Sequence, residues 1–149
     1  MKERSDAALM EATLAAVAEA GIDIRHTLFE RFLSAYPERH PAFLNLDAAS
    51  RRMTDETLQI LFGLATDEGW VWPLVAELVA THRNYGMLPT DEYDAFIDLA
   101  IDELGRAAGR AWTGAQAWRR QGEILKAMIR RALAEWESAM PGGRAATPA

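Results

Sequence analysis

Apolar residues recur with the spacing of an α-helix along most of this 149-residue chain, and the strict alternation of a half-buried strand is nearly absent. Glycines and prolines interrupt the pattern, and these residues end or begin helices. The interruptions include Gly21, Pro37, Gly69 and Gly86. The pattern therefore predicts an all-α fold of about seven helices joined by short connections.

The same pattern predicts where the helices lie. Asp47 and Thr90 are expected to cap the helices that follow them, because a side-chain oxygen can accept a hydrogen bond from the first turn. Pro73 is expected in a first turn, where its missing N–H breaks no helical bond. We expect helices over residues 5–21 and 23–36, a short turn from residue 37, and helices over 47–65, 72–86, 90–104 and 113–133.

The length and composition favour one domain. A chain of 149 residues usually forms a single domain, and 50% hydrophobic residues are sufficient for a core. We therefore expect one domain over residues 1–140. Residues 141–149 are mostly glycine, proline and alanine, which bury little surface, so we expect a disordered tail there.

The formal net charge is −6, and the chain has no cysteine. Nucleic acid and anionic membranes bind basic surfaces, so neither is an expected partner. No run of about 18 apolar residues could span a membrane, and the N-terminus opens into an amphipathic helix rather than a signal sequence. These features predict a cytoplasmic protein without disulfides or thiolate ligands.

One histidine, His82, lies in line with two leucines. Leu74, Leu78 and His82 recur every four residues, so they share one face of a helix. An imidazole on an apolar face needs a polar partner, because an unpaired buried polar group is costly. Two interpretations stay open at this point: a core histidine bonded to a backbone carbonyl, or a metal ligand.

His82 also begins the pattern His82-x-x-Tyr85-Gly86. The stretch from Leu78 to Ile129 resembles the second half of bacterial single-domain globins and of the globin domain of flavohaemoglobins. In that family this pattern closes the helix that carries the haem ligand. The resemblance implies that His82 is the proximal ligand of haem iron.

Residues 28–43 resemble the segment of the same family that ends in a phenylalanine packed on the haem face, here Phe43. The resemblance covers about residues 7–135, and Phe43 and His82 stand at a spacing normal for the family. It implies a globin fold, a sandwich of about seven helices around haem b, with residues 1–140 as the globin domain. The haem would be bound non-covalently, since the chain has no cysteine to attach it.

The resemblance implies a haem-lining set and a partner for the metal ligand. The lining positions are Phe29, Phe43, Met53, Thr57, Leu78, Met87 and Ile97. A metal-bound imidazole donates its other N–H to a fixed acceptor, and the carbonyl of Leu78, one turn before His82, is the expected acceptor. Many relatives add a tyrosine–glutamate pair, but Gln121 and Gly122 fall about where that tyrosine lies, so we expect the imidazole to stay largely neutral.

The gas-binding side departs from the family pattern. Phe29 stands where relatives commonly have a tyrosine, and phenylalanine has no hydrogen-bond donor. The position of the family's glutamine or histidine falls on Ala49 or Ser50, and the next inward position falls on Met53 or Thr54. The hydroxyls available on this side are those of Ser50, Thr54 and Thr57.

The other histidines and the tryptophans are expected to have structural or surface roles. His26 lies on the same predicted helix as Phe29, where a distal ligand is one interpretation and a surface or interhelical role is the other. His40 lies on a short turn, where exposure to solvent is expected. The five tryptophans are expected to pack in the core or at its rim.

The resemblance leaves three functions to compare. The first is a globin that reversibly binds a diatomic gas (O2, CO or NO). The second is a haem enzyme, a nitric-oxide dioxygenase or peroxidase-like protein, which needs a separate reductase. The third is a haem-free globin-fold module for signalling or protein interaction, and either a monomer or a homodimer suits all three. Because the gas-binding side lacks a strong donor, the sequence favours the first function and argues against a specialised enzyme.

Overall fold

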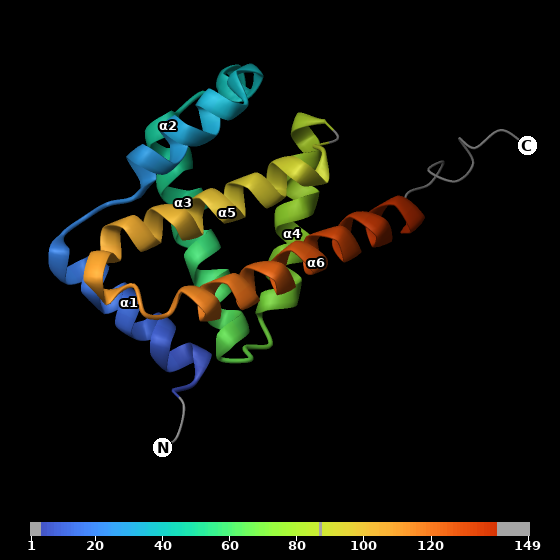
Figure 1. The fold of residues 1–149 in the computed structure, drawn as a ribbon. Helices are drawn as coiled ribbons and strands as arrows, with labels where there is room; N and C mark the ends of the chain where they lie inside the picture. Colours follow the sequence, from blue (N-terminus) through green and yellow to red (C-terminus); the bar gives the residue numbers. More distant parts are fainter. Residues whose placement is uncertain (1–3, 87, 140–149) are drawn as a thin grey trace, which may run out of the picture.

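The computed structural model describes residues 4–86 and 88–139, and the described part contains helices and no strand (Figure 1). The all-α prediction is therefore confirmed. The six α-helices and the turn after residue 36 are the seven expected segments, in the expected order. The elements are α1 (Asp6–Ala20), α2 (Arg25–Ala35), η1 (Pro37–Ala42), α3 (Leu46–Ala65), α4 (Val71–His82), η2 (Arg83–Tyr85), α5 (Thr90–Ala108), η3 (Gly109–Ala111) and α6 (Ala115–Ala139), where η marks a 3-10 helix.

Local sequence signals explain both ends of α1. The Ser5 side chain accepts a hydrogen bond of 3.1 Å from the backbone N–H of Ala8, as an N-cap does. At the other end Gly21 has φ 69°. This left-handed conformation is easily adopted by glycine, which has no Cβ. Both ends lie where the sequence predicted them.

Two predicted N-caps were wrong. The cap of α3 is Asn45 rather than Asp47, because the Asn45 side chain accepts a 3.0 Å bond from the N–H of Ala48. Asp47 lies inside the first turn, where its negative charge is still favourable. Thr90 is likewise the first residue of α5, and the extended backbone of Pro89 precedes it without a side-chain cap.

Four of the helices form two layers, with α5 and α6 in one layer and α3 and α4 in the other. α5 and α6 run antiparallel and side by side across the front of the view, with α3 and α4 behind them (Figure 1). α1 packs against α5, α6 and α3, whereas α2 packs mainly against α5 and α3. Among the described residues, no helix is long and apolar enough to cross a bilayer.

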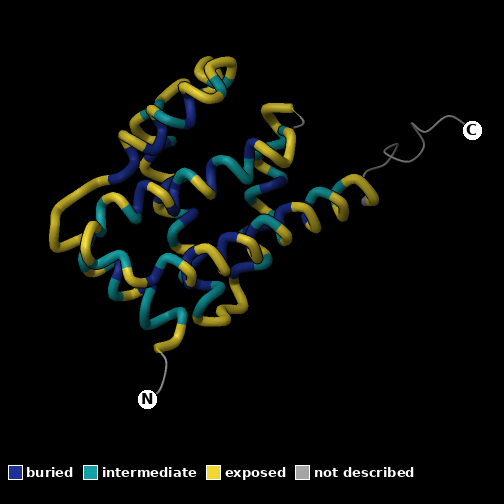
Figure 2. Tube along the Cα trace, viewed as in Figure 1, coloured by how far each residue is buried: buried dark blue, intermediate teal, exposed yellow. Residues whose placement is uncertain are grey.

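The buried apolar residues form two separate clusters. The larger cluster draws on α1, α3, α4, α5 and α6, with Met10, Leu61, Val75, Leu104 and Trp118 among its members. The smaller cluster joins α2 to α5 and consists of Leu28, Phe29, Phe32, Leu33, Phe96 and Ala100. Buried positions line the inner sides of the helices (Figure 2). The second helix is therefore attached to the molecule through an aromatic cluster of its own.

A carboxylate at the start of α1 ties this helix to α6. Asp6 accepts two hydrogen bonds from the Arg120 guanidinium, of 2.5 and 3.0 Å, and one of 3.0 Å from the Gln121 amide. The bond from Arg120 is the largest cause of a pKa of Asp6 below its ordinary value, and burial opposes it. The folded state therefore holds the charged form of Asp6 more firmly than the unfolded chain does.

We predict that Asp6→Asn lowers the free energy of unfolding by about 0.5–1 kcal/mol at pH 7, because the partly exposed pair is screened by water. A lowered folded-state pKa contributes stability above the unfolded pKa of about 3.9. That contribution is lost as the pH falls through the folded-state pKa, so the two proteins should converge at lower pH. Urea unfolding between pH 2 and pH 7 measures this, with Glu11→Gln on the exposed face of α1 as the control. A deficit that persists unchanged at pH 2 would contradict the prediction.

Candidate functional site

His82 is the last residue of α4 and is half-buried. Its Nδ1 lies 2.8 Å from the carbonyl oxygen of Leu78, so the predicted bond to Leu78 is present. Because a carbonyl only accepts, Nδ1 is the nitrogen that carries the proton in the neutral ring. The lone pair is then on Nε2. This is the tautomer in which an imidazole can bind a metal ion while its other nitrogen is held by the protein.

The face of α4 that carries His82 is not the most buried one. Val71, Val75 and Val79 are almost fully enclosed, whereas Leu74 and Leu78 are half-buried like His82. The apolar face shared by Leu74, Leu78 and His82 therefore borders the interior rather than lying at its centre. The three valines form the neighbouring face of α4, and this face lies within the larger cluster. Leu74 and Leu78 pack against the larger cluster from outside, and His82, on the same face of α4, lies at the margin of that cluster.

Tyr93 is a neighbour of His82 that the sequence analysis missed. The two rings meet edge to face, with centroids 5.7 Å apart and planes at 60°. Burial is the main reason that the pKa of Tyr93 is raised, and Arg83 nearby opposes the shift. The sequence signal that could have identified Tyr93 is its helical spacing with Phe96 and Ile97, which places the three residues on one face of α5. The imidazole is thus restrained by a hydrogen bond on one side and an aromatic ring on another.

Phe29 and Phe43 lie together in the smaller cluster. Phe29 is 3% exposed, and its ring centroid lies 5.7 Å from that of Phe43 and 5.4 Å from that of Phe96. Phe43 is half-buried at the edge of the cluster. The side of the molecule formed by α2 therefore presents aromatic carbon and no hydrogen-bond donor at position 29.

On α3 the structure decides which residues face inward. Ser50 is 4% exposed and Thr54 is also 4% exposed, whereas Ala49 and Met53 are half-buried. Of the two registers left open by the sequence, the inward positions are thus Ser50 and Thr54. Met53 packs instead on the edge of the smaller cluster.

The three hydroxyls on this face of α3 are not equivalent. Ser50 donates to the carbonyl of Asp47 at 3.0 Å, and Thr57 donates to the carbonyl of Met53 at 2.8 Å. The hydroxyl of Thr54 is buried and has no hydrogen-bond partner. Only Thr54 among these three residues therefore has an uncommitted hydroxyl.

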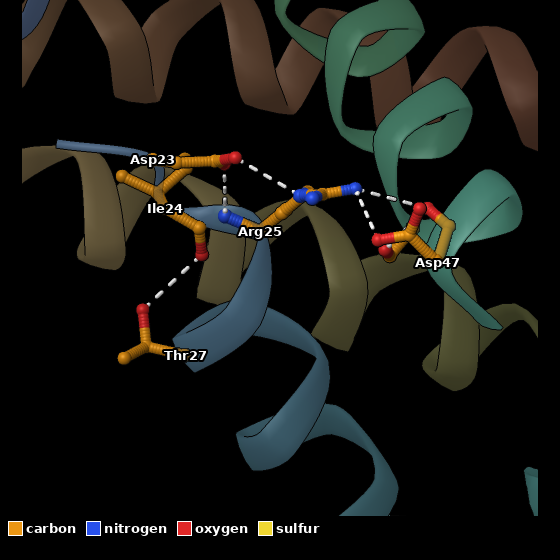
Figure 3. A network of polar contacts seen from close by, with 6 residues as sticks. Asp23, Ile24, Arg25, Thr27 and Asp47 are labelled. Atoms are coloured by element: carbon orange, nitrogen blue, oxygen red, sulfur yellow. Dashed lines mark hydrogen bonds and ion pairs between the residues drawn. The ribbon is translucent and has the colours of Figure 1, made fainter. Parts of the chain in front are cut away.

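A buried arginine holds the start of α3 against the start of α2 (Figure 3). Arg25 is 8% exposed, and its Nε lies 2.9 Å from the Asp23 carboxylate. One terminal nitrogen of Arg25 donates to the carbonyl and to the carboxylate of Asp47, each at 3.0 Å. Buried arginine is tolerated when it is paired in this way. This contact fixes the first turn of α3, and with it the inward direction of Ser50 three residues later.

Gln121 does not reach toward His82. Its amide donates to Asp6 at the start of α1, so the side chain is directed to α1. A Cβ at the next residue, Gly122, would lie 2.8 Å from Cδ1 of Ile101, leaving no space there for a larger side chain without rearrangement. Neither residue supplies the imidazole with a second polar partner.

The predicted site residues fall into two groups. His82, Leu78 and Ile97 belong to or border the larger cluster, while Phe29, Phe43 and Met53 belong to or border the smaller one. Thr57 lies on the inward stripe of α3, and Met87 falls outside the described residues, as does the predicted tail over 141–149. The structure places the two groups in separate clusters.

The other two histidines are exposed, as expected for His40 and as the surface interpretation of His26 requires. His26 and His40 both line a cleft of about 560 Å³ between α2, η1 and the start of α3, together with Phe29 and Ser50. In the parts of the chain that the structure describes, no three histidine, cysteine or acidic side chains cluster as metal ligands would.

These features define an all-α protein with a half-buried, pre-oriented histidine on one side and an aromatic cluster on the other. No family model, no curated protein and no solved structure matches the chain. What the site can do chemically is therefore inferred from its own residues.

Proposed function

We propose that this protein is a globin that holds haem b non-covalently through His82 and reversibly binds a diatomic gas. The observation that carries the proposal is the 2.8 Å bond from His82 Nδ1 to the Leu78 carbonyl. This bond leaves Nε2 as the metal-binding nitrogen and fixes the ring orientation.

The residues present fit a haem group. Porphyrin is a large, flat and mainly apolar ring, and it needs apolar contacts on both faces. Leu78 and Ile97 border His82 and would supply apolar contacts on that side, and Phe43 and Met53, at the smaller cluster, would supply them on the other. Haem, when bound, would supply an iron atom that binds a diatomic gas reversibly. The absence of cysteine leaves non-covalent attachment as the mode of binding.

The surroundings of His82 support gas binding more than catalysis. Its nitrogen-bound proton goes to a neutral carbonyl and not to a carboxylate, so the imidazole is a moderate electron donor. Tyr93 limits rotation of the ring from its edge. Phe29 offers no donor that would polarise a bound molecule. Chemistry that breaks an O–O bond benefits from a strongly electron-donating histidine and from a hydrogen-bond donor beside the bound molecule. A specialised dioxygenase or peroxidase is therefore the weaker candidate.

A globin fold is part of the proposal. The helix order, with a 3-10 turn after α2 and a histidine at the end of α4, agrees with the resemblance to bacterial single-domain globins. In this proposal α4 supplies the iron ligand through His82. An electron donor would be a separate reductase, and a diatomic gas would be the small-molecule partner.

A haem titration tests the proposal. Purified protein without haem is titrated with haemin, and we expect a Soret band that saturates at about one haem per chain, together with a reversible carbon monoxide difference spectrum. The same chain unfolded in urea serves as the control for non-specific haem adsorption. If the folded protein takes up no more haem than the unfolded one, a haem-free role is the correct interpretation.

A further inference from the structure

Two of the three histidines of the chain, His26 and His40, line one cleft of about 560 Å³ between α2, η1 and the beginning of α3, here called the histidine cleft. Clefts that bind small molecules commonly have volumes of about 300–1,000 Å³, with apolar walls and a few polar groups. The third histidine, His82, does not line it. The histidine cleft is therefore a second place at which the protein can bind a molecule.

The more buried part of the lining is apolar. Phe29 is 3% exposed and Leu33 is 9% exposed, and both belong to the smaller cluster. Leu46, the first residue of α3, is half-buried and also lines the cleft. These side chains give a bound molecule a carbon surface to pack on, so the cleft favours a ligand with an apolar body.

The outer part of the lining carries hydrogen-bond acceptors that the protein does not use. His26 and Glu30 lie one turn apart on α2, so they share a face of that helix, and His40 lies on η1. All three residues are exposed. Within residues 4–86 and 88–139, their side chains have no hydrogen bond and no ion pair. A carboxylate only accepts hydrogen bonds, and a neutral imidazole accepts one.

The charge of the lining decides the sign of the ligand. Arg25 is the cation of the lining, and it is already paired with Asp23 at 2.9 Å and with Asp47 at 3.0 Å (Figure 3). Glu30 and Asp47 both line the cleft, so with histidine counted as neutral its net charge is negative. Like charges repel and unlike charges attract. The histidine cleft therefore favours a cation over an anion.

A second cleft, of about 600 Å³ between α2, α5 and α6, lacks this property. The carboxylate of Asp102 there lies 2.6 Å from the Arg31 guanidinium. The carboxylates of Asp98 and Glu123 lie 2.7 and 2.8 Å from the Lys126 ammonium group. A cation would have to displace one of these bases, so the histidine cleft is the better cation site.

We propose that the histidine cleft binds a small protonated organic amine that carries an apolar ring. An ammonium group has three N–H donors, and Glu30, His26 and His40 supply a carboxylate and two imidazoles as acceptors. A metal ion is the poorer occupant, because no three such side chains of the described residues cluster as metal ligands would. Hydrogen bonds of about 2.7–3.2 Å allow acceptors to stand further apart than metal bonds do. His82 has no part in this site, so the inference does not depend on haem.

Three probes of similar shape test the proposal: phenethylamine, which is protonated at pH 7, neutral 2-phenylethanol and anionic 3-phenylpropionate. Each is titrated into the purified protein at fixed pH, and proton–carbon NMR records the signals of the histidine rings. Phenethylamine should shift the signals of His26 and His40 in a saturable way and leave that of His82 unchanged. It should bind about two- to fivefold more tightly than 2-phenylethanol, as expected for an ion pair that water partly screens. The anion should bind most weakly.

Two variants on the exposed side of α2 locate the site. Glu30→Gln should weaken phenethylamine binding by about two- to fivefold and leave 2-phenylethanol binding unchanged. Glu11→Gln, on the exposed side of α1, is its control and should change neither. Ser34→Trp places a large ring in the cleft and should abolish binding, whereas Ala35→Trp, at an exposed residue that does not line the cleft, should not.

Three results would overturn the proposal. Equal binding of the three probes would mean that the cleft accepts an aromatic ring without regard to charge. Unchanged phenethylamine binding by Ser34→Trp would place the amine elsewhere on the protein. The absence of any saturable shift at His26 and His40 would mean that the cleft binds no amine. If Ser34→Trp does not fold, as judged by circular dichroism, Ser34→Phe and Ala35→Phe allow the same comparison.

Discussion

His82→Ala is expected to reduce haem affinity by more than about 100-fold. Loss of a residue that merely supports a metal ligand costs about 10- to 100-fold in metal affinity, and loss of the ligand itself costs more. Alanine is a good helix former, and His82 is the last residue of α4, so the fold should be retained. The Soret band of the reconstituted variant should be absent or shifted, and added imidazole should restore it by entering the space of the missing side chain.

The exposed histidines provide the controls for this experiment. His26→Ala and His40→Ala remove an imidazole from the surface of the molecule, and both variants should keep the haem spectrum of the unaltered protein. Far-ultraviolet circular dichroism would show that all three variants retain their helices. An unchanged spectrum for His82→Ala would mean that His82 does not bind the iron.

Phe96→Ala is expected to give a large loss of stability. Phe96 is 8% exposed, and its ring meets those of Phe29 and Phe32 with centroids 5.4 Å away in each case. Removing a buried phenylalanine side chain costs about 3–5 kcal/mol, whereas a typical domain has about 5–15 kcal/mol in total. Because these three rings join α2 to α5, the loss should fall on that contact. Urea unfolding of the haem-free protein measures it.

Leu44→Ala is the control for this measurement. The side chain of Leu44 is 99% exposed, so its removal should change the free energy of unfolding by less than about 0.5 kcal/mol. A loss below about 1 kcal/mol for Phe96→Ala would show that the smaller cluster contributes little to folding.

The sequence predicted the helices well where one signal was decisive. The helix expected over residues 5–21 begins directly after the Ser5 cap and ends at Gly21, so both of its ends are confirmed. Before α3, Asn45 and Asp47 are two good N-caps only two residues apart. The choice between them depends on where the chain leaves η1, and the local sequence pattern does not specify that point.

For the candidate site, the sequence predicted contacts within one helix better than contacts between helices. The bond from His82 to Leu78 follows from a four-residue spacing and was predicted. The ring contact with Tyr93 depends on how α5 meets α4, and it was missed. The depth of the valine face of α4 and the unpaired hydroxyl of Thr54 also depend on packing between helices. Periodicity gives the faces of a helix, but the neighbouring helices decide how far each face is buried.

The packing of α1 against α5 and α6 has a consequence for synthesis of the protein. Chains are made from the N-terminus and can begin to fold as they emerge. Met10 and Thr13 on α1 are fully enclosed in the finished molecule, but the helices that enclose them are among the last to be made. Contacts between residues so distant in the chain also form slowly. The larger cluster therefore closes only when α6 has left the ribosome, and until then the apolar face of α1 stays open to water.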